Sequence, residues 1–262
     1  MPQTSAAYFS IDGMISAARI KFIKSLSEKK FRDREGLFTV EGEKMVSEAM
    51  VSSFEVTEVF RKEDIGVNAM GRISSLSSPS PVLATVRIPG NLSCPVEEAL
   101  PEGPGLYLAL DSIRDPGNMG TILRIADWFG IDGVFATPDS VDLFNPKVVQ
   151  STMGAIFRVK FHYVPVTSLL ERVSSLGGVS YGTFLEGKDI YTTSLSTGEL
   201  SPTVIVIGNE SRGISPEVGK LISSRITIPS FARKGEGSES LNAAVATAVT
   251  VSEFRRRTHT AE

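Results

Sequence analysis

Three stretches of the chain concentrate polar side chains and glycines that could bind or act on a ligand. They are DSIRDPGNMGTILRIADWFG (residues 111–130), VIVIGNESRGIS (204–215) and ITIPSFARKGEGSESLNAAVA (226–246). The first carries Asn118 and, six residues later, Arg124. The second carries Glu210, and the third carries Ser240 and Asn242. A turn between a strand and a helix needs only one or two residues of this kind, so the surplus predicts a site.

Each stretch includes or follows a short apolar run that predicts a β-strand. These runs are GLYLALD, TVIVIGNE and RITIP, and three further runs have the same character: GVFAT, VKFHYV and VSYGTF. Helical patterns lie between them, at 119–130, 146–157, 167–177, 215–224 and 240–257. Short apolar strands that alternate with helices predict a mostly parallel α/β sheet covered on both faces. Ligands of such sheets bind at the carboxyl ends of the strands, where these polar residues stand.

Taken one at a time, the polar residues also have structural interpretations. Asn118 and Ser240 could cap the helices that follow them, and Gly130 could end a helix. Arg124 could form a surface ion pair, and Glu210 could be a solvated loop carboxylate. A site is favoured because three such turns occur at corresponding strand ends.

Several kinds of chemistry lack support in the sequence. DPGNMG does not have the G-x-G-x-x-G spacing of a dinucleotide site, and no phosphate loop of the form GxxxxGK[ST] is present. A serine nucleophile would require G-x-S-x-G or a nearby histidine, and neither is found. The single cysteine, Cys94, and the two distant histidines, His162 and His259, give no zinc-ligand spacing and no disulfide. The sequence therefore predicts no metal.

Length and charge limit the class of protein further. A chain of 262 residues is long enough for two domains. A formal net charge of -3 argues against a generally cationic protein that coats nucleic acid, although it allows a local basic patch. The chain begins with no basic segment followed by an apolar one, and no apolar run approaches the ~20 residues of a membrane span. We therefore expect a cytoplasmic protein with no membrane partner.

The first part of the chain predicts a small α/β domain. Residues 14–31 have helical spacing of apolar residues and carry most of a basic cluster that continues to Arg34. Strands are expected at LFTVEG, EVTEVFRKE and PVLATVRIP, and a helix at EKMVSEAMVSS. GNLSCPVEEALPEGPG is rich in proline and glycine and is typical of a linker. We place the domain boundary there, giving domains 1–96 and 97–262.

The three polar stretches resemble, in order, the three motifs of the SpoU family of RNA ribose methyltransferases, which belongs to the SPOUT superfamily. The family pattern is Asp-Pro-x-Asn-x-Gly with a downstream arginine, then Gly-Asn-Glu-x-x-Gly, then Ile-Pro followed by Ser-Leu-Asn. The match covers about residues 105–255. The resemblance implies a mostly parallel sheet with a deep trefoil knot near the C-terminus, S-adenosylmethionine as cofactor, a ribose 2′-hydroxyl as methyl acceptor, and a homodimer.

The resemblance also implies roles for individual residues. Arg124 would activate the hydroxyl, either as a proton acceptor or as a cation that stabilises the alkoxide. Asn118, Glu210, Ser240 and Asn242 would complete the catalytic set. The cofactor would be held at four positions, namely Thr183, Gly208, Ile228 and Leu241. The segment between Pro229 and Ser240 is longer than is usual in the family, and its Arg233 and Lys234 could contact RNA or lie on an uninvolved surface loop.

Residues 24–50 resemble the small RNA-binding domain, similar to certain ribosomal proteins, that precedes many SpoU domains. We expect RNA contact from five basic residues, Arg19, Lys24, Lys29, Lys30 and Arg32. A ribosomal-protein-like domain favours ribosomal RNA as the substrate. Two alternatives stay open: a transfer-RNA 2′-O-methyltransferase, and a knotted protein that binds RNA without catalysis.

Overall fold

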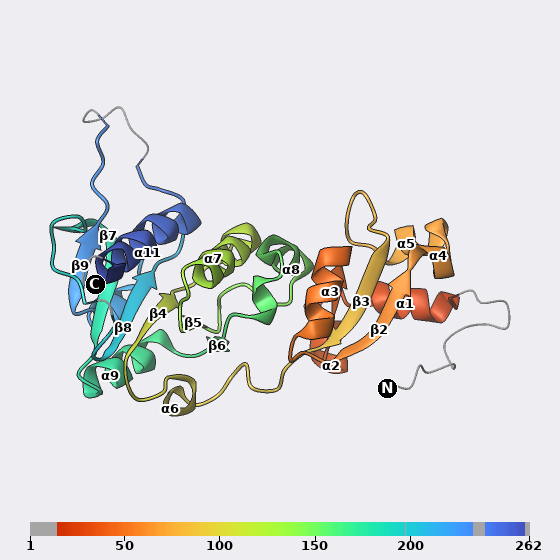
Figure 1. The fold of residues 1–262 in the computed structure, drawn as a ribbon, viewed down its shortest axis with the longest axis horizontal. Coiled ribbons are helices and arrows are strands. Elements are labelled where there is room, and N and C mark those ends of the chain that lie inside the picture. Colours follow the sequence, from red (N-terminus) through yellow and green to blue (C-terminus); the bar gives the residue numbers. More distant parts are fainter. Residues whose placement is uncertain (1–14, 197, 233–238, 260–262) are drawn as a thin grey trace. The chain divides into compact units, whose positions relative to one another are not determined.

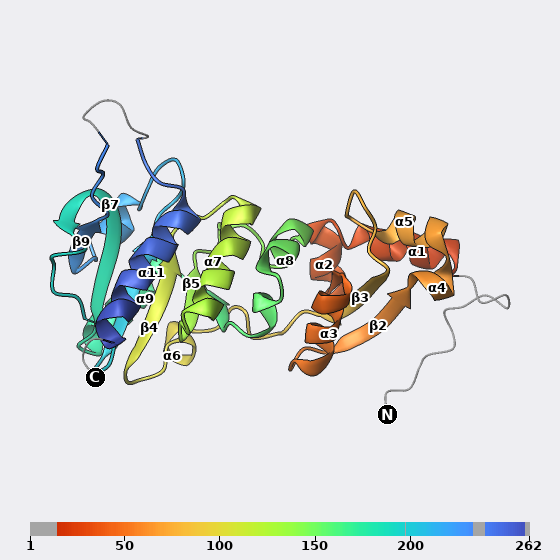
Figure 2. The same ribbon diagram turned by 45° about the horizontal axis from the view of Figure 1, so that its top comes forward.

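The computed structural model describes residues 15–196, 198–232 and 239–259, which form two compact units. The first unit comprises the chain up to Pro89 together with the later segment Asp142–Phe157. The second comprises Gly90–Val141 and the chain from Arg158 onward. Figure 1 and Figure 2 show the elements of each unit. In the described ranges no helix is long and apolar enough to cross a membrane.

The first unit contains an antiparallel sheet of three strands in the order β1-β3-β2. The strands are β1 (Leu37–Glu41), β2 (Val56–Arg61) and β3 (Val82–Arg87), as the alternation of apolar residues predicts. The helices are α1 (Ala17–Ser25), α2 (Lys29–Glu35), α3 (Glu43–Val51), α4 (Lys62–Ile65) and α5 (Val67–Ile73). The apolar pattern of the sequence predicted no helix over residues 64–73, which hold half of α4 and all of α5.

The predicted helix over 14–31 is wrong in one respect, because the chain forms two helices there. The hydroxyl of Ser25 donates to Phe22 O, and that of Ser27 donates to Lys24 O. The Arg32 guanidinium then takes the carbonyls of Leu26 and Ser27, each at 2.8 Å. Carbonyls that a continuous helix would use are thus satisfied by side chains, and the helix ends.

A segment from the second half of the sequence completes the core of the first unit. It carries α8 (Pro146–Thr152) and a short 3-10 helix (Ala155–Phe157). The ring of Phe144 packs on Phe38 at 4.5 Å between centroids, and Phe157 packs edge-on against Phe54 at 5.2 Å. The Arg32 guanidinium, 2% exposed, pairs with Asp142 at 2.5 Å. The first unit therefore needs residues 142–157 to bury its aromatic rings and its charged arginine.

The second unit is a parallel sheet of six strands in the order β6-β5-β4-β8-β7-β9. The strands are β4 (Gly105–Leu110), β5 (Gly133–Ala136), β6 (Phe161–Tyr163), β7 (Val179–Asp189), β8 (Pro202–Ile207) and β9 (Ser224–Thr227). The helices are α6 (Val96–Ala99), α7 (Pro116–Trp128), α9 (Val166–Ser175), α10 (Pro216–Gly219) and α11 (Ala243–His259). The predicted parallel α/β fold is confirmed.

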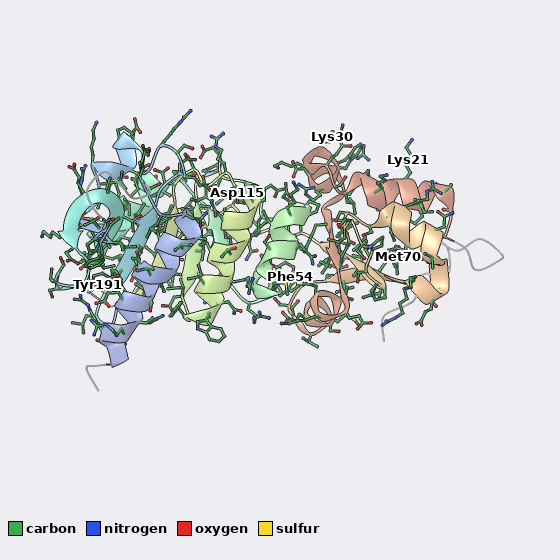
Figure 3. The ribbon with its side chains drawn as sticks, turned by 90° about the horizontal axis from the view of Figure 1, so that it is seen from above. Lys21, Lys30, Phe54, Met70, Asp115 and Tyr191 are labelled. Atoms are coloured by element: carbon green, nitrogen blue, oxygen red, sulfur yellow. The ribbon has the colours of Figure 1, made fainter. Side chains whose placement is uncertain are left out.

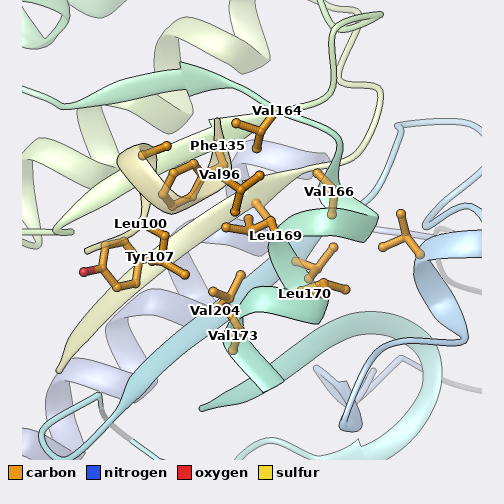
Figure 4. Packing of buried hydrophobic residues seen from close by; sticks show 14 of the residues in the cluster. Val96, Leu100, Tyr107, Phe135, Val164, Val166, Leu169, Leu170, Val173 and Val204 are labelled. Atoms are coloured by element: carbon orange, nitrogen blue, oxygen red, sulfur yellow. The ribbon is translucent and has the colours of Figure 1, made fainter. Parts of the chain in front are cut away.

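Helices cover both faces of this sheet. Figure 4 shows α9 packing its apolar side, including Leu169 and Val173, against Phe135 and Val204 of the strands. The connection through α7 runs from β4 outward to β5, whereas that through α9 returns from β6 to β7. Right-handed crossovers in opposite directions place their helices on opposite faces. Because α11 packs against α7, these two helices share the face opposite α9 (Figure 1, Figure 2).

The stretch predicted to be a linker is partly packed. Tyr163 N donates to Leu92 O at 2.7 Å, and Val96, Ala99 and Leu100 lie in the core beside α9. This packing explains why residues 90–100 belong to the second compact unit.

Asp142→Asn should selectively loosen the first unit. The change keeps the side-chain shape but leaves the buried Arg32 charge uncompensated, at a cost of about 3 kcal/mol. Hydrogen–deuterium exchange of β1 and β3 amides should accelerate. Asp33→Asn is the matched control, since Asp33 and its partner Lys29 are both more than half exposed. Equal exchange in the two variants would contradict a structural role for the pair.

Glu253 should make the second unit sensitive to acid. Hydrogen bonds from Arg256 are the largest cause, with Arg257 adding to them, of a Glu253 pKa lowered to about 2. A depressed folded-state pKa stabilises the fold above the unfolded pKa of about 4.3 and loses that effect as the pH falls toward 2. The difference in melting temperature between the protein and Glu253→Gln should therefore be largest at neutral pH and shrink below pH ~4.5. A difference that does not vary with pH would argue against this.

Candidate active site

The first two polar stretches meet because β4 and β8 are neighbours. Leu110 at the end of β4 is paired with Ile207 at the end of β8, so the turns that follow emerge side by side. Asn209 Nδ2 donates to Ser112 O at 2.7 Å, and Ser215 N donates to the Asp111 carboxylate at 2.7 Å. The two turns are thus tied together at the carboxyl edge of the sheet.

Glu210 is the centre of this arrangement. Its carboxylate accepts the side-chain amide of Asn118 at 3.0 Å. It also accepts the backbone N–H groups of Asp115 at 3.3 Å and Arg114 at 3.5 Å. These donors lie at and just before the start of α7, where a negative charge is also favoured by the helix dipole. Glu210 therefore holds the first turn in place from the second.

Asn242, in the third stretch, joins the same cluster. Its Nδ2 donates to Asn118 Oδ1 at 2.8 Å. Because a carboxylate only accepts, Asn118 must present its NH₂ to Glu210 and its oxygen to Asn242, which fixes the orientation of both amides. The result is a continuous chain Asn242–Asn118–Glu210 built from residues 92 and 124 positions apart.

The structure corrects two of the capping interpretations. Asp115, not Asn118, caps α7, since its carboxylate accepts Asn118 N at 2.8 Å. At α11 the amide oxygen of Asn242, not the hydroxyl of Ser240, accepts the first free N–H groups, those of Ala244 and Val245. The side chain of Asn118 therefore caps no helix. Asn242 caps α11 with its oxygen and donates to Asn118 with its NH₂, so both side chains belong to the cluster.

The turn that follows β5 also supports the first polar stretch, a contact that was not expected from the sequence. Ser112 has a positive φ of 58°, uncommon outside glycine. Its N–H donates to Thr137 Oγ1 at 2.9 Å and its hydroxyl donates to Asp139 at 2.8 Å. Hydrogen bonds from Thr137 first, and then from Ser112 and Arg114, lower the pKa of Asp139. The signal in the sequence was the polar run that directly follows the strand GVFAT.

Arg124 and Ser240 do not join the cluster within one chain. Both are exposed, and neither side chain makes a hydrogen bond or ion pair within the described residues. Six residues of α7 separate Arg124 from Asn118, which at 3.6 residues per turn puts them on different faces of the helix. Asn118 is 7% exposed and faces inward.

Of the four positions expected to hold the cofactor, Thr183 lies within β7, Gly208 and Ile228 directly follow β8 and β9, and Leu241 precedes α11. Thr183 pairs with Ile226 of β9, and its hydroxyl donates to Val206 O of β8 at 3.2 Å. Gly208 is buried, and a Cβ there would stand 2.3 Å from the backbone of Gly213, so only glycine fits. Ile228 is half-buried and Leu241 is 51% exposed. Backbone groups beside two apolar side chains fit a flat, neutral adenine.

Comparisons with known proteins decide the family. The model of the SpoU rRNA Methylase family matches residues 105–252, more than half of the chain. The chain belongs to the SpoU rRNA methylase family. The MRM3-like substrate binding domain matches residues 17–84.

Relatives in this family resemble the chain over nearly its whole length. It is 27% identical to the 23S rRNA (guanosine(2553)-2'-O)-methyltransferase RlmP of Bacillus subtilis, over 90% of this chain and 96% of that protein. A structure from Porphyromonas gingivalis assigned to the TrmH family has a TM-score of 0.80 and 39% identity, covering 93% of this chain and 99% of its own. An AdoMet-bound rRNA methyltransferase from Sinorhizobium meliloti has a TM-score of 0.81 and 26% identity, covering 95% and 97%.

The basic residues expected to bind RNA differ in their surroundings. Lys24 is exposed, and Lys29 and Lys30 are exposed with carboxylate neighbours Asp33 and Glu28. Figure 3 shows Lys30 and nearby Lys21 pointing outward. Arg19 is mostly buried against Glu58.

The structure contradicts the RNA-binding role that was expected of Arg32. It is 2% exposed and fully engaged with Asp142 and two carbonyls, so it cannot reach RNA without breaking the first unit. Arg233 and Lys234 lie outside the described residues. Among the described residues, no group of histidine, cysteine and carboxylate side chains is arranged to hold a metal.

Glu210→Gln should disrupt the SpoU site without unfolding the protein. A glutamine replaces one acceptor oxygen with an NH₂ group, which then faces the N–H donors of the first turn. We expect methyl transfer to fall roughly 10- to 100-fold, the loss typical of a charge-assisted hydrogen bond in this range. Glu217→Gln, an exposed glutamate on α10, should retain activity. Full activity of Glu210→Gln at an unchanged melting temperature would remove Glu210 from the site.

Proposed function

We propose that this chain transfers the methyl group of S-adenosylmethionine to a ribose 2′-hydroxyl of ribosomal RNA. The observation that carries the proposal is the chain Asn242–Asn118–Glu210, which joins all three SpoU motifs in one hydrogen-bonded cluster. The named activities of the relatives, among them RlmP, support ribose 2′-oxygen as the acceptor and ribosomal RNA as the substrate.

The chemistry divides between the cofactor and the protein. A bound S-adenosylmethionine supplies a methyl group already activated on a sulfonium. Thr183, Gly208, Ile228 and Leu241 would hold it, mostly through backbone groups. The protein must orient the 2′-hydroxyl and stabilise the charge that develops on its oxygen.

Asn118 and Glu210 serve as positioning residues in this scheme. The NH₂ and the oxygen of the Asn118 side chain are both engaged, and each oxygen of Glu210 already accepts a hydrogen bond. We therefore assign both residues to orientation of the site and not to proton transfer. Arg124, exposed and without a partner in the described chain, is the residue we propose to act on the 2′-hydroxyl.

We propose further that Arg124 acts in a homodimer. It lies on an exposed stripe of α7 with Thr121 and Trp128, at helical spacing, and Trp128 is 85% exposed. An open hollow of about 420 Å³ lies at the adjoining α11, lined by Phe129, Tyr191, Ala248, Val249, Ser252 and Glu253. A second copy covering this apolar face would bury Trp128 and bring Arg124 to the neighbouring site.

The trefoil knot implied by the family remains part of the proposal. Two contacts support it. At one end of α11, Asn242 reaches Asn118 of the first motif. At the other end, the Arg257 guanidinium donates to the carbonyls of Ile190, Tyr191 and Thr193, which follow β7.

We assign RNA recognition to the first unit, through the exposed lysines of α1 and α2. The match to the MRM3-like substrate binding domain supports this assignment. A substrate of ribosomal RNA also favours the cytoplasm as the compartment.

The direct test is methyl transfer from labelled S-adenosylmethionine to total RNA from cells that lack this protein, followed by mapping of ribose methylation. We expect a single 2′-position in ribosomal RNA, in naked RNA or in ribosomal particles. Methylation confined to transfer RNA would change the substrate. No incorporation, with no cofactor binding by calorimetry, would support a protein that binds RNA without catalysis.

Mixing variants should show whether sites are shared between copies. Arg124→Ala and Glu210→Gln homodimers should each lose most activity, and both should bind cofactor normally. If Arg124 acts on the partner's site, co-expressed mixed dimers should regain up to half the activity per dimer, because one site keeps both residues. Trp128→Glu should yield an inactive monomer by light scattering. A fully active Trp128→Glu monomer would contradict the dimer proposal.

Changing Lys24, Lys29 and Lys30 together to glutamate should weaken RNA binding and leave cofactor binding intact, since these exposed charges attract phosphate. We expect at least a tenfold loss of RNA affinity at moderate salt. Lys44, Lys62 and Arg72 of the same unit, changed to glutamate, provide a control with the same change in net charge. Equal RNA affinity in both triple variants would place RNA recognition elsewhere.

A further inference from the structure

The tip of the second motif is a rigid turn. Asn209 and Gly213 exchange backbone hydrogen bonds of 3.0 and 2.9 Å. The amide oxygen of Asn209 accepts the N–H groups of Ser211 and Arg212, at 3.0 and 3.1 Å. Gly213 closes the turn with a φ of +69°. Hydrogen bonds within the turn therefore fix the backbone on both sides of Arg212, which lies two residues after Glu210.

Arg212 is the unpaired cation on this turn. Its side chain is exposed, and its guanidinium makes no hydrogen bond or ion pair within the described residues. The other arginine of the neighbourhood, Arg114, is already paired with Asp139 at 2.8 Å. A fixed backbone with an unpaired guanidinium reduces the entropy lost when a ligand is bound.

The surroundings make a cation necessary for an anionic substrate. Four carboxylates lie around the first two motifs, and among the described residues only two guanidinium groups, those of Arg114 and Arg212, carry the opposite charge there. The carboxylates belong to Asp111, Asp115, Asp139 and Glu210. Each carboxylate already accepts a hydrogen bond from a backbone or side-chain donor. An RNA backbone that approaches this edge needs a positive group that is not already committed.

We propose that Arg212 binds a backbone phosphate of the RNA next to the nucleotide to be methylated, and so positions the ribose over the cluster. This inference rests on the proposed function. In this assignment Arg212 contributes affinity and register and takes no part in proton transfer. The turn that carries Glu210 would thus serve two purposes, with its glutamate facing the protein and its arginine facing the substrate.

The experiment compares Arg212→Gln and Arg212→Lys with Lys160→Gln in the full-length protein. Lys160 is exposed and stands at the amino end of β6, the opposite edge of the sheet. We expect Arg212→Gln to raise the KM for RNA about five- to tenfold with kcat within about twofold. The slope of log affinity against log salt should fall by about one. Arg212→Lys should recover the salt slope and part of the KM, and Lys160→Gln should match the parent.

Two outcomes would overturn the proposal. One is an unchanged KM and salt slope in Arg212→Gln. The other is a fall in kcat with unchanged KM, which would point to the chemistry or to a disturbed Glu210. Cofactor affinity and melting temperature, measured on the same samples, identify a disturbed turn. Absence of methyl transfer by the parent protein would instead refute the proposed function, and the salt dependence of RNA binding would still test Arg212.

Discussion

The site depends on the fact that a carboxylate can only accept hydrogen bonds. Glu210 lies just beyond the end of β8 and accepts the backbone N–H groups of Arg114 and Asp115, which precede α7, together with the side-chain amide of Asn118. Once Asn118 is turned toward Glu210, its oxygen can be satisfied only by a donor, and Asn242 supplies it. One charge therefore orders three segments that lie far apart in the sequence. The adjacency of β4 and β8 and the return of α11 to the same edge are the conditions that allow this.

Helix α7 divides two tasks between its faces. Its buried side carries Asn118 into the cluster, and its exposed side carries Arg124 and Trp128 away from it. Such a division is costly for a monomer, because a large indole in water gains nothing from packing. It fits the proposed homodimer, in which Arg124 would act at the site of another copy.

The sequence was informative where chemistry and periodicity agreed. Apolar runs such as GLYLAL and TVIVI predicted the parallel sheet, and the rule for carboxyl ends placed Asn118 and Glu210 together. Capping was misassigned, because Asp115, Asn118 and Asn242 are all good caps and only geometry decides which carboxyl or amide oxygen reaches the free N–H groups. Arg32 was mistaken for a surface residue, since its counterion Asp142 lies 110 positions away. No local pattern reveals such a pairing, nor the support that Thr137 and Asp139 give to Ser112.

The discontinuous first unit has a consequence for how the chain is made. Its sheet and first helices are encoded before residue 90, but Asp142, Phe144 and Phe157 are synthesised later, after the segment Gly90–Val141 of the second unit. At a translation speed of about 5–20 residues per second, the 68 residues from 90 to 157 take roughly 3 to 14 seconds to synthesise. During that interval the rings of Phe38 and Phe54 lack their contacts with Phe144 and Phe157, and Arg32 lacks its counterion. The nascent N-terminal half should therefore be a client for chaperones, and the ribosome that builds this protein must finish the crossover after β5 before the amino-terminal domain is complete.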